Sequence, residues 1–174
     1  MTKSIITFAF FTIISVLLAA CHTMQKSTDM DKTFLASPGC KADGFSYKNQ
    51  QLVLNSQYGL TTQQLYFIKD SGPAGVWLDY QPLGTDQAAG WRSYIRGGKW
   101  AALAVDKKNF RMVCLARDKN EVKQFIDCEK VLQVCRAASA NLLSGHQGTY
   151  WLAENGSLDD VLTSVHRQGI TLMQ

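Results

Sequence analysis

Short apolar runs separated by turn-forming residues recur through the chain from about residue 38 onward. Runs of four to eight residues rich in Val, Ile, Leu and aromatic side chains are typical of β-strands. The pattern predicts strands at Gln51–Leu54, Leu65–Ile68, Val76–Tyr80, Trp100–Val105, Phe110–Ala116, Glu121–Ile126, Val131–Arg136 and Thr149–Ala153. Because only Asp106–Asn109 separates Trp100–Val105 from Phe110–Ala116, we expect these two strands to form a hairpin.

The period of the pattern changes near the C-terminus. Ser157 precedes Asp160 by three residues, which is the spacing of a capping box at a helix start. One apolar helix face follows, made of Leu158, Val161, Leu162 and Val165. Gly169 stands where glycine commonly ends a helix, and Ile170–Leu172 is expected to be a closing strand. The fold class predicted is mainly β, a compact β-sandwich or curled antiparallel sheet with one C-terminal amphipathic helix.

The N-terminus has a pattern of its own: Lys3, then the sixteen uncharged, mostly apolar residues Ile5–Ala20. A helix of this length spans about 24 Å, less than the ~30 Å hydrocarbon core of a bilayer. A basic residue before a short apolar run favours a secretory signal peptide. The run ends in Leu18-Ala19-Ala20-Cys21, which resembles the lipobox of bacterial lipoproteins. That resemblance implies cleavage before Cys21 and attachment of lipid to its thiol and new α-amine.

The residues after Cys21 bear on location and domain organisation. In lipoproteins of this type an Asp after the cysteine usually retains the protein at the inner membrane. His22 stands there instead, which favours the outer membrane, on either face. His22–Ser37 has few large apolar residues and is expected to be a flexible tether. The predicted organisation is a signal peptide over residues 1–20, lipidated Cys21 and tether over residues 21–37, and one domain over residues 38–174.

The remaining cysteines are even in number, which favours disulfides in an oxidising, extracytoplasmic compartment. They are Cys40, Cys114, Cys128 and Cys135. Three pairings are possible, and the sequence does not choose among them. Because no Cys-x-x-Cys occurs, neither a thioredoxin-like redox role nor a zinc site is expected.

Composition and charge narrow the function classes. The 174 residues are 46% hydrophobic and 18% charged, which excludes disordered and low-complexity proteins. The net charge is +4 with no run of four basic residues, so no nucleic-acid partner is expected. One basic and aromatic stretch is a possible binding surface, made of Trp91, Arg92, Tyr94, Arg96, Lys99 and Trp100. The glycines Gly97 and Gly98 within it fit an anion or glycan site, or simply a turn.

Candidate catalytic residues are few, and no nucleophile-elbow, zinc-protease or nucleotide-binding motif occurs. His146 lies in a glycine-flanked segment that fits a solvated loop, and His166 is expected at the edge of the helix's polar face. Asp159 and Asp160 are better explained by the helix dipole than as an acid–base pair. We therefore expect no cofactor, no metal and no catalytic residue.

A second, less specific resemblance covers about half of the chain. Its residues are Trp100–Asp106, Cys114, Cys128, Val131–Cys135 and Thr149–Asn155, which look like small enhanced-entry (EnhB-type) lipoproteins of intracellular bacterial pathogens. This resemblance implies an envelope protein linked to host-cell entry and carries over no catalytic residue.

The functional hypothesis is therefore a lipid-anchored structural or interaction module of the bacterial outer membrane, with an envelope or host protein as partner. Two alternatives stay open. One is a periplasmic cell-wall hydrolase that uses His146, and the other is a small-ligand carrier with a pocket inside the sheet.

Overall fold

The computed structural model describes residues 29–55, 63–81, 92–106, 109–117, 123–137 and 148–173. The chain divides into two compact units, Met1–Phe34 and Leu35–Gln174. In the first unit the described residues, 29–34, are helical, within the segment expected to be a tether. The second unit contains all the described strands and two disulfides.

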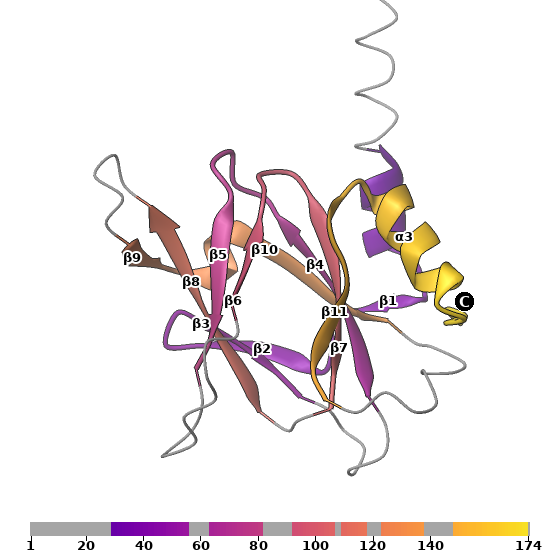
Figure 1. Cartoon of the computed structure of the whole chain (residues 1–174), viewed down its shortest axis with the longest axis horizontal. Coiled ribbons are helices and arrows are strands. Elements are labelled where there is room, and N and C mark those ends of the chain that lie inside the picture. The colour runs from indigo at the N-terminus through magenta and orange to yellow at the C-terminus, as the bar shows by residue number, and fades with distance from the viewer. Residues whose placement is uncertain are drawn as a thin grey trace, which may run out of the picture. The chain divides into compact units, whose positions relative to one another are not determined.

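The first sheet has five antiparallel strands in the order β1-β10-β4-β7-β11 (Figure 1). Their bounds are Cys40–Lys41 (β1), Leu132–Ala137 (β10), Gln64–Asp70 (β4), Trp100–Val105 (β7) and Tyr150–Gly156 (β11). The central strands β4 and β7 are buried along nearly their whole length, which explains their continuous apolar sequences.

The second sheet is also antiparallel, with the order β2-β3-β8-β5-β6, and β9 pairs with the C-terminal half of β8. Its strands are Phe45–Lys48 (β2), Gln51–Leu54 (β3), Phe110–Arg117 (β8), Val76–Tyr80 (β5), Arg92–Ile95 (β6) and Lys123–Ile126 (β9). The sequence pattern did not predict β1, β2 or β6, because these strands are short or mostly polar.

The two sheets pack face to face as a sandwich, so the predicted mainly β fold class is confirmed. Alternate residues of each strand point into the space between the sheets. Side chains of the core include Leu52, Leu54, Tyr66, Ile68, Val76, Leu78, Leu103, Val105, Met112 and Val134. The eight strands predicted from the sequence all occur, with bounds that shift by a few residues.

The C-terminal helix α3 (Leu158–Arg167) covers the outer side of the first sheet, where it contacts β7 and β11 (Figure 1). Its buried residues are Leu158, Val161 and Val165. The capping box is confirmed, because the Ser157 hydroxyl accepts from the Asp160 backbone N–H and the Asp160 carboxylate accepts from the Ser157 N–H. Gly169 has a φ of 80° just after the helix. The expected closing strand is reduced to a single bridge residue, Leu172.

The predicted hairpin between Trp100–Val105 and Phe110–Ala116 is wrong. β7 lies in the first sheet between β4 and β11, and β8 lies in the second sheet between β3 and β5. Both lateral edges of β7 are therefore occupied by other strands. The connection at residues 106–109 carries the chain from one sheet to the other.

A short helix that the sequence pattern did not predict, α2 (Cys128–Val131), joins β9 to β10. The Asp127 side chain caps it by accepting from the Glu129 backbone N–H at 3.1 Å. Cys128 is fully buried in the core and bonded to Cys114 of β8. This disulfide therefore ties the second sheet to the segment that enters the first.

Side chains join β6 of the second sheet to β11 of the first. The Asn155 amide donates to the Tyr94 carbonyl oxygen at 2.8 Å and accepts from the Arg96 backbone N–H at 2.7 Å. Ser93 in β6 also donates to the Glu154 carboxylate. Asn155 has a φ of 58°, a left-handed conformation that asparagine tolerates better than most residues. Its amide thus takes the place of a neighbouring strand at the edge of β6.

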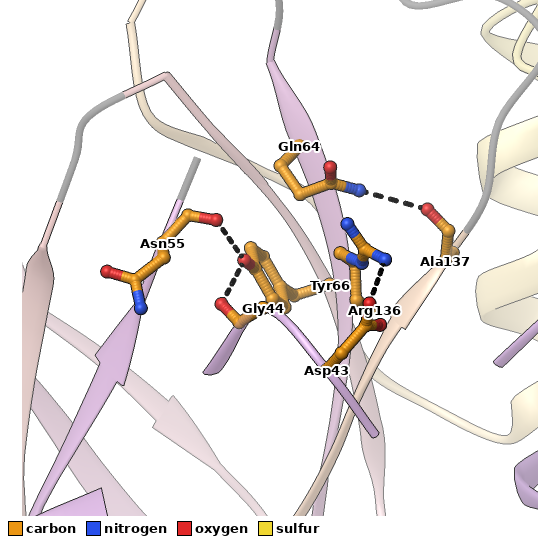
Figure 2. A network of polar contacts seen from close by, with 7 residues as sticks. All are labelled: Asp43, Gly44, Asn55, Gln64, Tyr66, Arg136 and Ala137. Atoms are coloured by element: carbon orange, nitrogen blue, oxygen red, sulfur yellow. Dashed lines mark hydrogen bonds and ion pairs between the residues drawn. The ribbon is translucent and has the colours of Figure 1, made fainter. Parts of the chain in front are cut away.

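A second polar network joins the sheets on the side of β2 and β10 (Figure 2). The fully buried Tyr66 hydroxyl lies 2.7 Å from the Gly44 carbonyl oxygen and 2.8 Å from that of Asn55, and its proton serves both. Burial raises the pKa of Tyr66 to about 12, so the hydroxyl keeps its proton. Beside it, Arg136 pairs with Asp43 (Figure 2).

We predict that Ser157→Ala lowers the free energy of unfolding by about 1 kcal/mol, because the first turn of α3 loses its cap. Urea denaturation measures this. Hydrogen bonds from Ser157 hold the pKa of Asp160 below its usual value, so the loss shrinks as the pH falls through that pKa. Thr163 is exposed in the same helix, and Thr163→Ala is the control. It is expected not to lower the free energy of unfolding. Equal losses in the two variants would contradict the capping role.

The two disulfides are expected to differ in their contribution to stability. Cys40–Cys135 closes a loop with a sequence separation of 95, and Cys114–Cys128 one with a separation of 14. In the chain-entropy model these loops correspond to about 4.7 and about 3 kcal/mol. The test replaces each cysteine pair with alanines in a chain that carries Cys21→Ser. Urea denaturation then measures which disulfide contributes more to the free energy of unfolding. A larger loss from the 114–128 pair would contradict the expected order.

Candidate functional site

The outer face of the second sheet is the candidate site. Of the two helices described in the second unit, α3 packs on the first sheet and α2 places Cys128 in the core. Neither helix lies over the outer face of β5, β6 and β8. Alternation along β5 places Val76 and Leu78 in the core and turns Trp77 and Asp79 to this outer face.

Four apolar side chains form a line across this face, which we call the aromatic row: Tyr94, Trp77, Leu115 and Phe125. The strand register sets it, because Trp77 lies opposite Tyr94 of β6 and opposite Leu115 of β8, and Leu115 lies opposite Phe125 of β9. With strands about 4.8 Å apart, the row is about 14 Å long. Leu115 is 5% exposed, whereas Phe125 at the end of the row is 73% exposed.

Trp77 makes the closest ring contacts of the aromatic row. Its ring centroid lies 4.9 Å from that of Tyr94, with the planes tilted by 38°. The Arg117 guanidinium lies 4.9 Å from the Trp77 ring and the Arg92 guanidinium 6.0 Å from it, both within cation–π range. Arg92 also donates two hydrogen bonds of 2.5 Å to the Asp79 carboxylate, and these raise the pKa of Arg92.

Basic side chains border the aromatic row. Arg117 of β8 lies opposite Lys123 of β9, next to the Leu115–Phe125 pair. Arg111, also on the outer side of β8, lies opposite Val53. On this face the described strands β5, β6, β8 and β9 therefore carry Arg92, Arg111, Arg117 and Lys123 against the single carboxylate of Asp79.

The structure separates the residues of the basic and aromatic stretch predicted from the sequence. Arg92 and Tyr94 lie on the outer face of the second sheet, while Arg96 and Lys99 are exposed in the turn after β6. Trp100 is only 1% exposed, and the Lys69 ammonium lies 5.6 Å from its ring. Trp100 is therefore a core residue and contributes nothing to a binding surface. Trp91 lies outside the described residues.

The glycine pair in that stretch forms a tight turn. Lys99 N–H donates to the Arg96 carbonyl at 3.0 Å, and Gly98 N–H donates to the Asp70 carbonyl at 2.9 Å. A Cβ on Gly97 would lie 2.5 Å from the Gly72 carbonyl oxygen, closer than atoms approach. Gly97 is thus required by close backbone packing, and the Gly98 N–H is taken by a protein carbonyl.

The cysteines of the domain are paired as Cys40–Cys135 and Cys114–Cys128, one of the three pairings left open by the sequence. Cys21 and His146 lie outside the described residues. His166 is exposed and its Nδ1 lies 3.1 Å from the Ile170 carbonyl oxygen. Asp159 and Asp160 are both exposed in the first turn of α3. Within the described ranges, no group of three or more His, Cys, Asp or Glu is placed to hold a metal ion.

A pocket of about 350 Å³ opens beside the Cys40–Cys135 disulfide. Its apolar lining includes Leu35, Phe45, Tyr47 and Val134, with Lys41 and Glu129 among its polar residues. Burial, with the carboxylates of Glu129 and Asp127, raises the pKa of Tyr47 to about 12. The Tyr47 hydroxyl keeps its proton and donates to the Leu132 carbonyl at 3.2 Å.

Comparisons of this chain with protein-family models, with curated proteins and with solved structures found no match. Among the described helices, none is long and apolar enough to cross a membrane. Function must therefore be argued from the residues and their arrangement.

Sequence reasoning missed Trp77, Arg117 and Phe125 as surface residues. The alternation in Val76–Tyr80 could have predicted that Trp77 faces outward, because the aliphatic residues Val76 and Leu78 on either side of it are buried. Arg117 and Phe125 come together only through the pairing of β8 with β9.

Asp70, at the end of β4, is a buried carboxyl group that we predict to be pH-sensitive. It is 1% exposed; Oδ1 accepts from the Gly72 N–H at 2.7 Å, and Oδ2 has no hydrogen-bond partner among the residues that the structure describes. Burial raises the pKa of Asp70, so the folded state holds the proton more tightly than the unfolded state. Stability from this group is present at low pH and is lost as the pH rises through its folded-state pKa.

The measurement is the free energy of unfolding of wild type and of Asp70→Asn from pH 4 to 7. The asparagine side chain does not titrate, so the stability of wild type relative to the variant is expected to fall as the pH rises. A difference that stays constant, or grows with pH, would contradict the raised pKa.

Proposed function

We propose that this chain is a bacterial outer-membrane lipoprotein, anchored by lipid on Cys21, and that its sandwich domain is a non-catalytic interaction module of the cell envelope. The proposal starts from the sequence, where Leu18-Ala19-Ala20-Cys21 follows a short apolar run that begins after Lys3. The resemblance to enhanced-entry lipoproteins extends the proposal to a link with entry into host cells.

The cysteine arrangement is the observation that supports the proposal most. The chain has five cysteines. Four of them pair within the domain as two disulfides, one between β1 and β10 and one between β8 and α2. The odd cysteine is the one at the lipobox position, and pairing of the others favours an oxidising compartment.

Lipid on Cys21 would supply a strong anchor. Burial of an acyl chain contributes about 0.8 kcal/mol per CH₂, so one ~16-carbon chain supplies up to roughly 13 kcal/mol. Two or three chains make dissociation from a bilayer negligible. The domain then needs no membrane-spanning element of its own.

The aromatic row supports an interaction role for the domain. Large apolar side chains at the surface of a soluble domain commonly mark a contact site when basic or polar groups border them. Phe125 and Trp77 have that setting, with Arg117 and Lys123 beside them. We place the contact surface of the domain here, and Arg92 and Tyr94 from the predicted stretch belong to it.

A second candidate function is carriage of a small apolar ligand, which the pocket beside Cys40–Cys135 favours. Its volume of about 350 Å³ lies within the range of small-molecule sites. Native mass spectrometry of the protein purified from membranes tests this function, since a carrier is expected to retain a ligand of defined mass. Loss of that mass in Ala42→Trp, which narrows the pocket at an exposed lining position, would support carriage, and a protein that never retains a ligand would contradict it.

The test of the anchor is the intact mass of protein extracted from membranes, with and without reductant. We expect a chain that begins at residue 21, carries two or three acyl groups and gains the mass of four hydrogens on reduction, from two disulfides. Cys21→Ser is expected to lose the acyl mass and accumulate as uncleaved precursor. Cys40→Ser, which breaks a disulfide in the domain, is the control and keeps the acyl mass. An unacylated residue 21 in the wild-type protein would overturn the proposal.

A further inference from the structure

We propose that the outer face of the second sheet docks on an anionic lipid bilayer, with Phe125 among the lipid headgroups and with Arg117 and Lys123 against lipid phosphates. The inference rests on the proposed function for the presence of a bilayer next to the domain. It goes beyond it by assigning this face to the lipid surface itself, so that the acyl anchor and the sheet bind the same membrane.

The exposed ring of Phe125 is the first observation. It is 73% exposed, more than any other large hydrophobic residue that the structure describes. It lies on β9, which pairs with β8 through Leu115, and Leu115 is 5% exposed. The ring therefore stands on a rigid apolar support and points away from the core. Aromatic rings at such positions bind the headgroup region of a bilayer, where their apolar surface leaves water.

Charge complementarity is the second observation. The described strands of this face carry four basic side chains and one carboxylate, that of Asp79, which pairs with Arg92. The Nε atom of Arg111 is buried, and the other two basic side chains are Arg117 and Lys123. Two of the basic side chains, Arg117 and Lys123, lie directly beside the Leu115–Phe125 pair. An apolar ring bordered by cations matches an anionic bilayer, which offers phosphates at its surface and hydrocarbon beneath.

The contacts of Trp77 favour a bilayer over an acidic polysaccharide. A saccharide ring needs the open face of an aromatic ring, but the Trp77 ring is already in contact with Tyr94, Arg117 and Arg92. A bilayer does not need a free ring face, because aromatic side chains with cations beside them bind at headgroup depth. The aromatic row also extends about 14 Å across four strands, which suits a surface rather than a single small molecule.

The experiment uses the chain from residue 21 to residue 174 with Cys21→Ser. This chain contains the whole second unit, Leu35–Gln174, and carries no acyl chain. Its result is therefore independent of acylation at Cys21. Co-sedimentation with vesicles of phosphatidylcholine, with or without phosphatidylglycerol, measures partitioning. We expect binding only to vesicles that contain phosphatidylglycerol, and we expect that binding to weaken as salt is raised.

Variants localise the binding. Each basic side chain near an anionic surface contributes about fivefold to partitioning, so Arg117→Gln with Lys123→Gln is expected to bind about 25-fold more weakly. Phe125→Ser is expected to lose about tenfold. The matched controls are Arg167→Gln with Lys130→Gln, exposed cations of α3 and α2, and Met173→Ser, an exposed apolar residue; they are expected to bind as wild type. Circular dichroism checks that each variant is folded.

Three outcomes would overturn the inference. One is absence of binding to vesicles that contain phosphatidylglycerol. Another is equal loss in the β8–β9 variants and in the controls, which would indicate a non-specific effect of net charge. The third is binding to soluble dextran sulfate, lost in Arg117→Gln with Lys123→Gln, without binding to vesicles; this would assign the face to a polyanionic polysaccharide instead.

Discussion

The strands of the described chain pair only within one sheet or the other, so side chains have to join the two sheets. The domain depends on this constraint. On one side Asn155 bonds to the edge of β6 through both ends of its amide. On the other side, the Tyr66 hydroxyl hydrogen-bonds to two backbone carbonyl oxygens and the Tyr47 hydroxyl to a third. Arg136 forms an ion pair with Asp43 there. These polar groups at the sides of the core each have a hydrogen-bond or ion-pair partner, so joining the sheets in this way leaves none of them unsatisfied.

Local patterns in the sequence were sufficient for the longer elements of this fold, but they missed β1, β2, β6 and α2 and did not indicate which strands pair. The strands at Leu65–Ile68 and Trp100–Val105 are apolar because both of their faces are buried, and the helix after Ser157 has caps at both ends. The hairpin expected around Asp106–Asn109 failed for a different reason. A short connection limits how far the chain travels, but it does not decide whether the next strand joins the same sheet, since that depends on which edges distant strands already occupy.

The same limit applies to the candidate site. The basic and aromatic stretch gave Arg92 and Tyr94 correctly as surface residues, but it also included Trp100, which is buried on the face of β7 opposite to Ala101 and Leu103. Phe125 and Trp77 lie far from each other in the sequence. The register of three strand pairs brings them into one row, and no local signal encodes that register. Pocket-lining residues were equally hidden, because they come from separate strands and from α2.

The Cys40–Cys135 bond has a mechanical consequence under the proposed anchoring, in which lipid on Cys21 holds the domain at its N-terminal end. β1 is only two residues long, so its few backbone hydrogen bonds to β10 would resist only a small force by themselves. The disulfide lies in the same strand pair and passes tension from β1 directly to β10, which is flanked by β4. A force on the domain would therefore be carried by this disulfide and then by the hydrogen bonds between β10 and β4. It would not separate β1 from the sheet first.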